Sequence, residues 1–232
     1  MIESRTARAW AVHALTASGG ALGALALFEL TRGRFEAAAI YMLIALGIDS
    51  VDGSLARRFE VARLAPSLDG RRLDDIVDYL NFAVVPAVFL LTLGALLHWG
   101  LAVFAVMASA YGFAQRDAKT PDDFFLGWPS YWNVLAIYLW LLGVGPGVAS
   151  ALVCLFGALI FVPLPYVYPS KLRRFRAATV VGGVVWIWSV AFCIWFPEST
   201  GRLHLLELSL LYPAWYVVLS AWLGGWGRER RP

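Results

Sequence analysis

The chain has 232 residues, of which 60% are hydrophobic and only 15% are charged, and its formal net charge is +3. This composition is too apolar for a water-soluble domain of this length and predicts an integral membrane protein. Membrane topology and attraction to anionic lipid explain the small excess of basic residues, so we expect no nucleic-acid partner.

Eight apolar segments follow one another without a long polar linker between them. They predict an all-α polytopic bundle of about eight transmembrane helices, which we expect to form one domain over residues 1–232. Several segments are shorter than the ~20 residues that a straight span requires. The segments are 10–30, 37–55, 76–97, 101–115, 131–143, 148–168, 177–196 and 205–226.

The basic residues divide unequally between the loops. If both termini are cytosolic, sixteen of the 19 Lys and Arg residues lie inside and three lie outside. This distribution satisfies the positive-inside rule, so we expect cytosolic termini. The outside set is Arg32, Arg34 and Arg202, and the inside set is Arg5, Arg8, Arg57, Arg58, Arg63, Arg71, Arg72, Arg116, Lys119, Lys171, Arg173, Arg174, Arg176, Arg228, Arg230 and Arg231.

Four aspartates lie at the ends of two neighbouring apolar segments. Asp49 and Asp52 are three residues apart at the end of the second segment, and Asp74 and Asp78 are four residues apart at the start of the third. Each pair therefore shares one face of a helix. Acids in membrane segments are costly without a neutralising partner and usually mark function. If the two pairs meet, their oxygen atoms would favour Mg²⁺, Mn²⁺ or Ca²⁺, so a metal site is predicted.

Small residues and an arginine accompany the first aspartate pair. Gly53, Ala56 and Arg57 lie on about the same helix face as Asp49 and Asp52. The small side chains would let a ligand or a second helix approach closely, and the guanidinium could bind an acid or a phosphate. The alternative is that the acids only cap helix ends and pair with nearby arginines. Capping explains one or two aspartates at a terminus, but not four in two helical registers.

The whole pattern is D-x2-D-G-x2-A-R followed, after an interval, by G-x3-D-x3-D. It resembles the signature of the CDP-alcohol phosphotransferase family at eight positions, from Asp49 to Arg57 and from Gly70 to Asp78. The interval over residues 58–69 is longer than is common in that family. Pro66 predicts that the excess is loop rather than helix, so the carboxylate pairs need not be displaced.

Further stretches resemble the branch of this family that the bacterial phosphatidylcholine synthases form. They are L-D-D-I-V-D-Y-L at 73–80, W-P-S-Y-W-N at 128–133 after Phe124 and Phe125, and Y-V-Y-P-S at 166–170. The resemblance covers about residues 41–170. It implies an enzyme of the bacterial inner membrane, with an active site facing the cytosol, and a homodimer.

The resemblance also implies the reaction, which is transfer of the phosphatidyl group from CDP-diacylglycerol to choline with release of CMP. It implies two divalent cations, Mn²⁺ or Mg²⁺, held by Asp49, Asp52, Asp74 and Asp78, and it implies that Asp78 is the general base. The CDP group would be bound by signature residues, namely Asp49, Asp52, Gly53, Ala56, Arg57, Gly70 and Asp74.

The acceptor site is expected to be aromatic. Because the quaternary ammonium of choline cannot donate a hydrogen bond, aromatic faces helped by acids are its natural partners. Each candidate could instead anchor the chain at the membrane interface. The candidates are Tyr79, Trp128, Tyr131, Trp132, Tyr166 and Tyr168.

Two alternative functions remain open. Within the enzyme class, a phosphatidylserine synthase or another relative would use the same catalytic core, and Lys171 or the arginines at 173, 174 and 176 could bind a phosphorylated acceptor. Outside it, a divalent-cation transporter would line its path with acids. The apolar segments between residues 91 and 196 contain no acid, which favours the enzyme.

Overall fold

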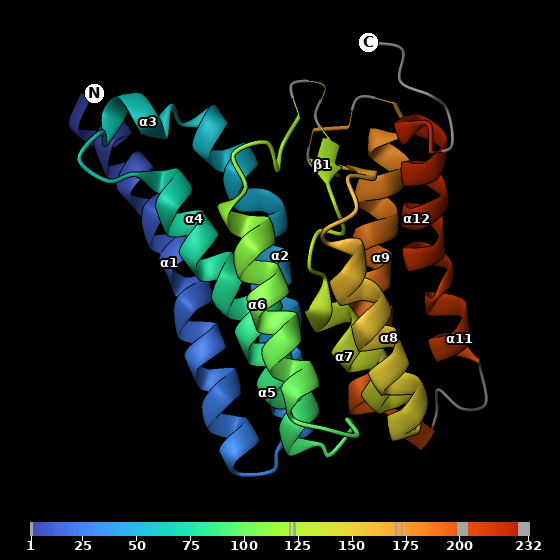
Figure 1. Ribbon diagram of the computed structural model, residues 1–232. Helices are drawn as coiled ribbons and strands as arrows, with labels where there is room; N and C mark the ends of the chain where they lie inside the picture. The colour runs from blue at the N-terminus through green and yellow to red at the C-terminus, as the bar shows by residue number, and fades with distance from the viewer. Residues whose placement is uncertain are drawn as a thin grey trace.

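Figure 1 shows a computed structural model of the chain, in which long helices run side by side as a bundle. The structure describes residues 2–120, 122, 124–169, 171–172, 174–198 and 204–226. Some residues named above for topology or for the acceptor lie outside the described residues, namely Ser170, Arg173, Arg202, Arg228, Arg230 and Arg231.

Helices dominate the described part of the chain, which confirms the prediction of an all-α membrane protein. In chain order they are α1 (Ile2–Thr31), α2 (Phe35–Arg58), α3 (Val61–Leu64), α4 (Gly70–Tyr79), the π-helix η1 (Leu80–Val84), α5 (Val85–Thr92), α6 (Gly100–Ala114), α7 (Trp132–Leu141), α8 (Pro146–Leu159), α9 (Arg176–Trp195), α11 (Leu205–Ser209) and α12 (Leu211–Gly224).

Five helical stretches are long and apolar enough to cross a membrane, and three shorter apolar helices accompany them among the described residues. Together they correspond to the eight apolar segments of the sequence. The chain is therefore a multi-pass membrane protein. The long stretches are Ser4–Thr31, Phe35–Arg58, Gly70–Thr92, Arg176–Trp195 and Leu205–Gly224, and the shorter helices are α6, α7 and α8.

Two local predictions need correction. The interval between the two halves of the signature contains the short helix α3, so the loop prediction is right for residues 65–69 but wrong for 61–64. Val61 of α3 is buried beside Ala9 of α1, and this contact holds the segment in a helical turn. The sixth apolar segment was expected to continue to residue 168, but its helix α8 ends at Leu159.

After α8 the chain forms one strand of a small sheet in place of the expected helix. Strand β1 (Phe124–Leu126) pairs antiparallel with β2 (Pro165–Val167), and Phe125 lies opposite Tyr166. Pro165 cannot donate a helical hydrogen bond, which favours an extended segment. Gly127, at φ +82°, crosses the end of α8 so closely that a Cβ would lie 2.3 Å from the carbonyl oxygen of Ile160. Glycine is therefore required at this crossing.

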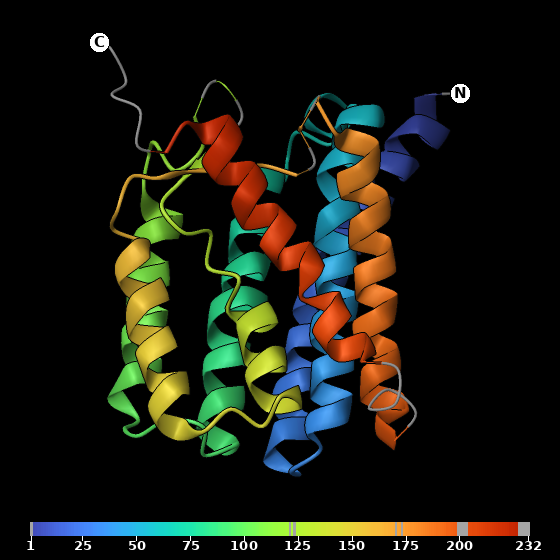
Figure 2. The ribbon, with the colours of Figure 1, turned by 90° about the vertical axis from the view of Figure 1, so that its right-hand side faces the viewer.

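One end of the bundle gathers the irregular elements. The start of α1, helix α3, strand β1 and the end of α12 all lie there (Figures 1 and 2). Arg5 and Arg63 both pair with Glu60 at this end. Arg34 lies at the opposite end, beside the turn between α1 and α2, and pairs with Glu29 at 3.4 Å. The separation of these basic residues agrees with the charge pattern, and the side of the membrane stays a prediction.

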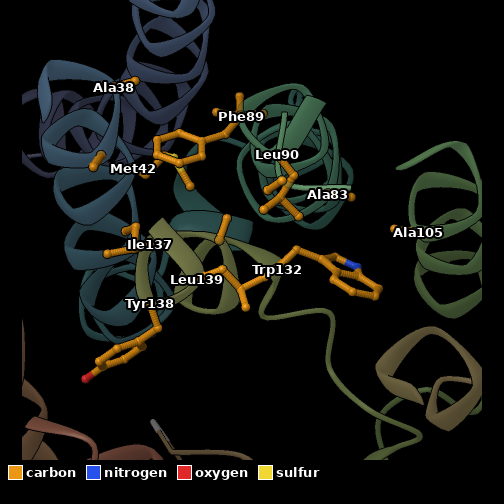
Figure 3. Close-up of a cluster of buried hydrophobic side chains, with 14 of the residues drawn as sticks. Ala38, Met42, Ala83, Phe89, Leu90, Ala105, Trp132, Ile137, Tyr138 and Leu139 are labelled. Carbon is orange, nitrogen blue, oxygen red and sulfur yellow. The ribbon is translucent and has the colours of Figure 1, made fainter. Parts of the chain in front are cut away.

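The main hydrophobic core lies between α2, α5 and α7. Figure 3 shows Met42 of α2, Phe89 of α5 and Ile137 of α7 converging there, while the Trp132 ring points away from them toward Ala105 of α6. Phe89 and Trp132 are fully buried, and the Phe89 ring packs edge-on against Trp140 at 5.8 Å. This core therefore fixes α2 against α5, which continues the helical stretch of α4 and η1. The aspartates lie on α2 and α4, nearer the end of the bundle that contains α3 (Figure 1).

Candidate active site

The first pair of aspartates lies near the end of α2 and the second pair lies on α4. Asp69 caps the start of α4, because its carboxylate accepts hydrogen bonds from the backbone N–H groups of Arg71 and Arg72 at 3.1 and 3.2 Å. The cap satisfies two of the free N–H groups of the helix start. It thereby sets the register in which Asp74 and Asp78 share a face.

The two helices bring three carboxylates together. One oxygen atom from each of Asp49, Asp74 and Asp78 lies within 4.8 Å of the others, and all three residues are partly buried. Like charges at that separation repel by roughly 3 kcal/mol per pair at an effective dielectric constant near 20. Such a group could bind a divalent metal ion, because hard oxygen ligands suit Mg²⁺, Mn²⁺ and Ca²⁺.

The fourth aspartate lies apart from this three-carboxylate group. Asp52 is only 5% exposed, and its Oδ2 accepts a 2.8 Å hydrogen bond from the Thr16 hydroxyl of α1. Its charge still acts on Asp49, Asp74 and Asp78. Asp52 is therefore a neighbour of the group, held in its own orientation by α1.

Glycines on α1 let this helix lie against α4 and η1. A Cβ at Gly19 would lie 2.8 Å from Val77 Cγ1, and one at Gly23 would lie 2.9 Å from Leu80 Cδ2. The Asn81 amide of η1 donates to the carbonyl oxygens of Gly19 and Val77, both at 2.9 Å. Small residues at such spacing are typical of close packing between membrane helices. The carboxylates of α4 are thus positioned against α1 as well as α2.

The remaining signature residues of α2 differ in their surroundings. Gly53 has open space beside it, since among the described residues a Cβ there would meet only the Arg57 Nη1 atom, at 3.5 Å. Arg57 is exposed and donates to the Ser54 hydroxyl at 3.1 Å. Ala56 instead packs against the small cluster that contains Val61.

Gly70 lies at the contact between α4 and α1. A Cβ at this position would lie 3.0 Å from the Cε1 atom of His13. The His13 ring is buried, and its Nε2 has no hydrogen-bond partner among the described residues. The glycine thus makes room for α1 at the start of the helix that carries Asp74.

Among the aromatic candidates, Tyr131 lies beside the carboxylates. Its ring packs edge-on against Phe82 at 6.1 Å and against Tyr216 of α12 at 5.5 Å. The Tyr131 phenol also interacts electrostatically with the Asp49 carboxylate. A tyrosine ring, which is ordinarily neutral at physiological pH, therefore lies near a negative charge.

Tyr168 and Tyr166 extend the aromatic surface along the second strand. The Tyr168 ring lies 4.5 Å from the Phe125 ring, and the ammonium groups of Lys119 and Lys171 lie 5.8 and 5.2 Å from its centre. These contacts show that the face of Tyr168 accepts cations. Tyr166 is 3% exposed and packs edge-on against Trp226 at 4.9 Å.

The other three candidates point into the bundle. Trp128 and Trp132 are both core residues, and the Trp132 Nε1 donates to the Ser109 hydroxyl at 2.7 Å. The Tyr79 hydroxyl donates to the carbonyl oxygen of Val106 on α6, at 3.2 Å. These contacts are typical of packing residues, which makes the three weaker candidates for contact with choline.

Several residues near the site carry no signal in the family signature. Thr16 and Lys119 reach the aspartates from α1 and from the loop before β1, and Tyr216 reaches Tyr131 from α12. For all three residues only the tertiary contacts show their place.

Comparison with known proteins gives a consistent family. The model of the family described as CDP-alcohol phosphatidyltransferase matches residues 11–195. A phosphatidylcholine synthase of Legionella pneumophila is 40% identical over 91% of this chain and 87% of its own length. Proteins with the same name in Pseudomonas aeruginosa and Legionella bozemanae are 33% and 35% identical, over 96% and 86% of this chain and 94% and 96% of their own lengths.

Proposed function

Because the chain belongs to the CDP-alcohol phosphatidyltransferase family, we propose that it transfers the phosphatidyl group from CDP-diacylglycerol to choline, giving phosphatidylcholine and CMP. The observation that carries this proposal is the three-carboxylate group formed by α2 and α4 beside the open face of Gly53. The names of the relatives support choline as the acceptor.

The oxygen-rich donor set of Asp49, Asp74 and Asp78 fits Mn²⁺ or Mg²⁺, and Asp52 would complete the ligands of a second ion. When bound, the cations would neutralise the pyrophosphate and the charge on the attacking and leaving oxygens. Gly53, Ala56, Arg57 and Gly70 would accommodate the CDP group together with the aspartates. The Arg57 guanidinium, exposed one turn beyond Gly53, would bind phosphate oxygens.

Asp78 would act as the general base. Its carboxylate would accept the hydroxyl proton of choline while the choline oxygen forms a bond to the lipid-linked phosphorus. The bond from that phosphorus to the bridging oxygen of CMP breaks, and CMP leaves with the electron pair. Its oxygen lies within 4.8 Å of an oxygen of Asp49, which would place this base at the edge of the metal site.

The choline ammonium would lie on aromatic faces near Asp49. Tyr131 has the strongest support, because its phenol interacts electrostatically with that carboxylate. Tyr166 of strand β2 and Tyr168, the residue after that strand, are the second choice, because the Lys119 ammonium already lies over the Tyr168 ring. A quaternary ammonium on such faces gains roughly 0.5–2 kcal/mol per favourable contact.

We further propose that the protein lies in the bacterial inner membrane with its active site facing the cytosol, and that it forms a homodimer like the family it belongs to.

Labelling with a membrane-impermeant maleimide would test the orientation, in a background without Cys154 and Cys193. Ser67→Cys, at the exposed end with α3, should react in inside-out vesicles only. Arg32→Cys, at the other end, should react in intact cells, and the reverse pattern would contradict the orientation.

The test of the reaction is CMP release by the purified protein from CDP-diacylglycerol in the presence of Mn²⁺ or Mg²⁺. Choline, serine, inositol phosphate and glycerol phosphate are offered in turn. We expect choline to support the fastest release, with none after chelation of the metal. Faster release with serine would make the protein a phosphatidylserine synthase. No release with any acceptor would reject the enzyme and favour the divalent-cation transporter, which proteoliposomes loaded with a Mn²⁺ indicator would then test.

A further inference from the structure

A short hairpin holds Lys119 beside the aromatic residues of the small sheet. The backbone N–H of Leu126 donates to the carbonyl oxygen of Ala118 at 3.0 Å, and that of Thr120 donates to Phe124 at 2.8 Å. Lys119 thereby pairs with Phe125, which pairs in turn with Tyr166 of β2. Directly opposed residues in antiparallel pairs share one face, so Lys119 lies on the face of Phe125 and Tyr166.

Aromatic rings support the Lys119 side chain from that face. Its Nζ lies 6.0 Å from the centre of the Phe125 ring and 5.8 Å from that of Tyr168. The residue is partly buried rather than solvated. Such contacts contribute only about 0.5–1 kcal/mol each at accessible sites, so the flexible lysine stem stays free to follow a ligand.

The charge of Lys119 acts on the three-carboxylate group. Its ammonium interacts favourably with Asp49, Asp74 and Asp78, all of which come from other elements. Within the described part of the chain, no ion pair of 4.0 Å or less joins it to an aspartate. The ammonium therefore lies near the carboxylates without being neutralised by direct contact.

We propose that Lys119 is a phosphate-binding residue that holds the pyrophosphate of the CDP-linked lipid against the three-carboxylate group. Lysine binds phosphate as a point charge with rotatable donors, which suits a group reached from a flexible stem. A negative pyrophosphate between an ammonium on one side and metal-binding carboxylates on the other would be neutralised from both sides. This inference rests on the proposed function and adds a donor-binding residue outside the signature.

The charge of Lys119 also assigns the two substrates to different sides. The Lys119 ammonium repels the quaternary ammonium of choline, so the acceptor would avoid the Phe125 and Tyr168 faces beside which Lys119 lies. Tyr131, beside Asp49, offers the acceptor a neutral ring and a negative charge instead. Lys119 therefore belongs to the donor side, and its loss should leave choline binding unchanged.

The test compares Lys119→Met, which keeps length but removes charge, with Lys119→Arg, which keeps charge. Lys171→Met is the matched control, because Lys171 is exposed and its ammonium lies over the same Tyr168 ring. For each variant, CMP release gives the KM of CDP-diacylglycerol and of choline at saturating Mn²⁺. Calorimetric titration with CDP and with cytidine, which lacks phosphate, gives a second readout that needs no turnover.

We expect Lys119→Met to lose roughly 10-fold or more in kcat/KM for CDP-diacylglycerol and in CDP affinity. The KM of choline and the affinity for cytidine should change less than about twofold, and Lys119→Arg should recover most of the loss. Three results would each overturn the proposal. They are an equal loss of affinity for CDP and for cytidine, a change confined to the KM of choline, and a change only in the Mn²⁺ requirement. If the wild type itself released no CMP, the proposed reaction would fail while the CDP titration still tested Lys119.

Discussion

The Thr16 hydroxyl donates a 2.8 Å hydrogen bond to Oδ2 of Asp52, and both side chains are buried. The two residues are 36 positions apart, on α1 and α2. Helix α1 contains none of the signature, yet it fixes the orientation of one carboxylate and packs through Gly19 and Gly23 against the helix that carries two others. Alignment of the aspartates therefore depends on an element outside the motif.

Replacing Thr16 with Val should lower activity without unfolding the protein. Valine keeps the volume of threonine but leaves Asp52 without its donor, and losing such a supporting partner typically costs roughly 10–100-fold in activity or metal affinity. Thr16→Ser, which keeps the hydroxyl, should recover most of the rate. CMP release at increasing Mn²⁺ would show the effect as a higher metal requirement. An unchanged metal requirement in Thr16→Val would remove Thr16 from any role at the site.

Neutralising any member of the three-carboxylate group should abolish turnover in a folded protein. Asp49→Asn, Asp74→Asn and Asp78→Asn each remove a charge and leave the volume, so we expect CMP release to fall roughly 100-fold or more. Each change also relieves repulsion, so the unfolding temperature without metal should stay equal or rise. Mn²⁺ should raise that temperature in the wild type and much less in the variants.

Asp75 provides the matched control for these aspartates. It lies on the same turn as Asp74 but pairs with Arg71 at 4.0 Å, and it is not part of the three-carboxylate group. Asp75→Asn should keep more than about half of the activity, since exposed pairs of this kind contribute little. Among the three variants of the three-carboxylate group, Asp78→Asn should retain the most CDP affinity, because a general base acts on the acceptor and not on the donor. Full activity in any one variant would exclude that residue from the site.

The sequence predicts the helices and the carboxylate pairs because both depend on local spacing. An apolar run indicates a span, and acids three or four residues apart share a helix face whatever surrounds them. The convergence of Asp49 with Asp74 and Asp78 was predictable only because each of the two helices carries a pair of acids and both pairs belong to one signature. The separate position of Asp52 was not predictable, because it depends on a hydroxyl 36 residues away in the chain.

The aromatic candidates show where sequence reasoning stops. Trp128, Tyr131 and Trp132 are neighbours in the chain, but Trp132 turns to Ser109 in the core while Tyr131 lies beside Asp49. Ser130 adopts a left-handed backbone conformation at φ +57°, and the chain enters α7 two residues later. That local bend and the contact with Tyr216 of α12 decide which aromatic ring faces the site. Neither composition nor residue spacing indicates them.

Adding a methyl group at Gly23 should damage both stability and activity. Its Cβ would lie 2.9 Å from Asn81 Oδ1 and Leu80 Cδ2, so these side chains or the helices α1 and η1 must shift. We expect Gly23→Ala to cost about 1–3 kcal/mol of stability and to lower kcat by displacing Asp78. Gly20→Ala is the control, because its Cβ would meet Val77 Cγ2 at an ordinary 3.7 Å. Similar unfolding temperatures and rates in both variants would contradict close packing as the reason for Gly23.

The acceptor prediction concerns Tyr131 and follows from the need of a quaternary ammonium for aromatic faces. Tyr131→Ala should raise the KM of choline by roughly 5–30-fold, which corresponds to ~1–2 kcal/mol, with little effect on the KM of CDP-diacylglycerol. Tyr131→Phe should cost less, because the ring face remains. Trp132→Ala should instead lose ~3–5 kcal/mol of stability, since its ring fills the core beside Ser109. If Tyr131→Ala leaves the choline KM unchanged, or if Tyr131→Phe costs as much as alanine, the ammonium does not lie on this ring. The same measurement on Tyr166→Ala and Tyr168→Ala then decides whether strand β2 supplies the cage in its place.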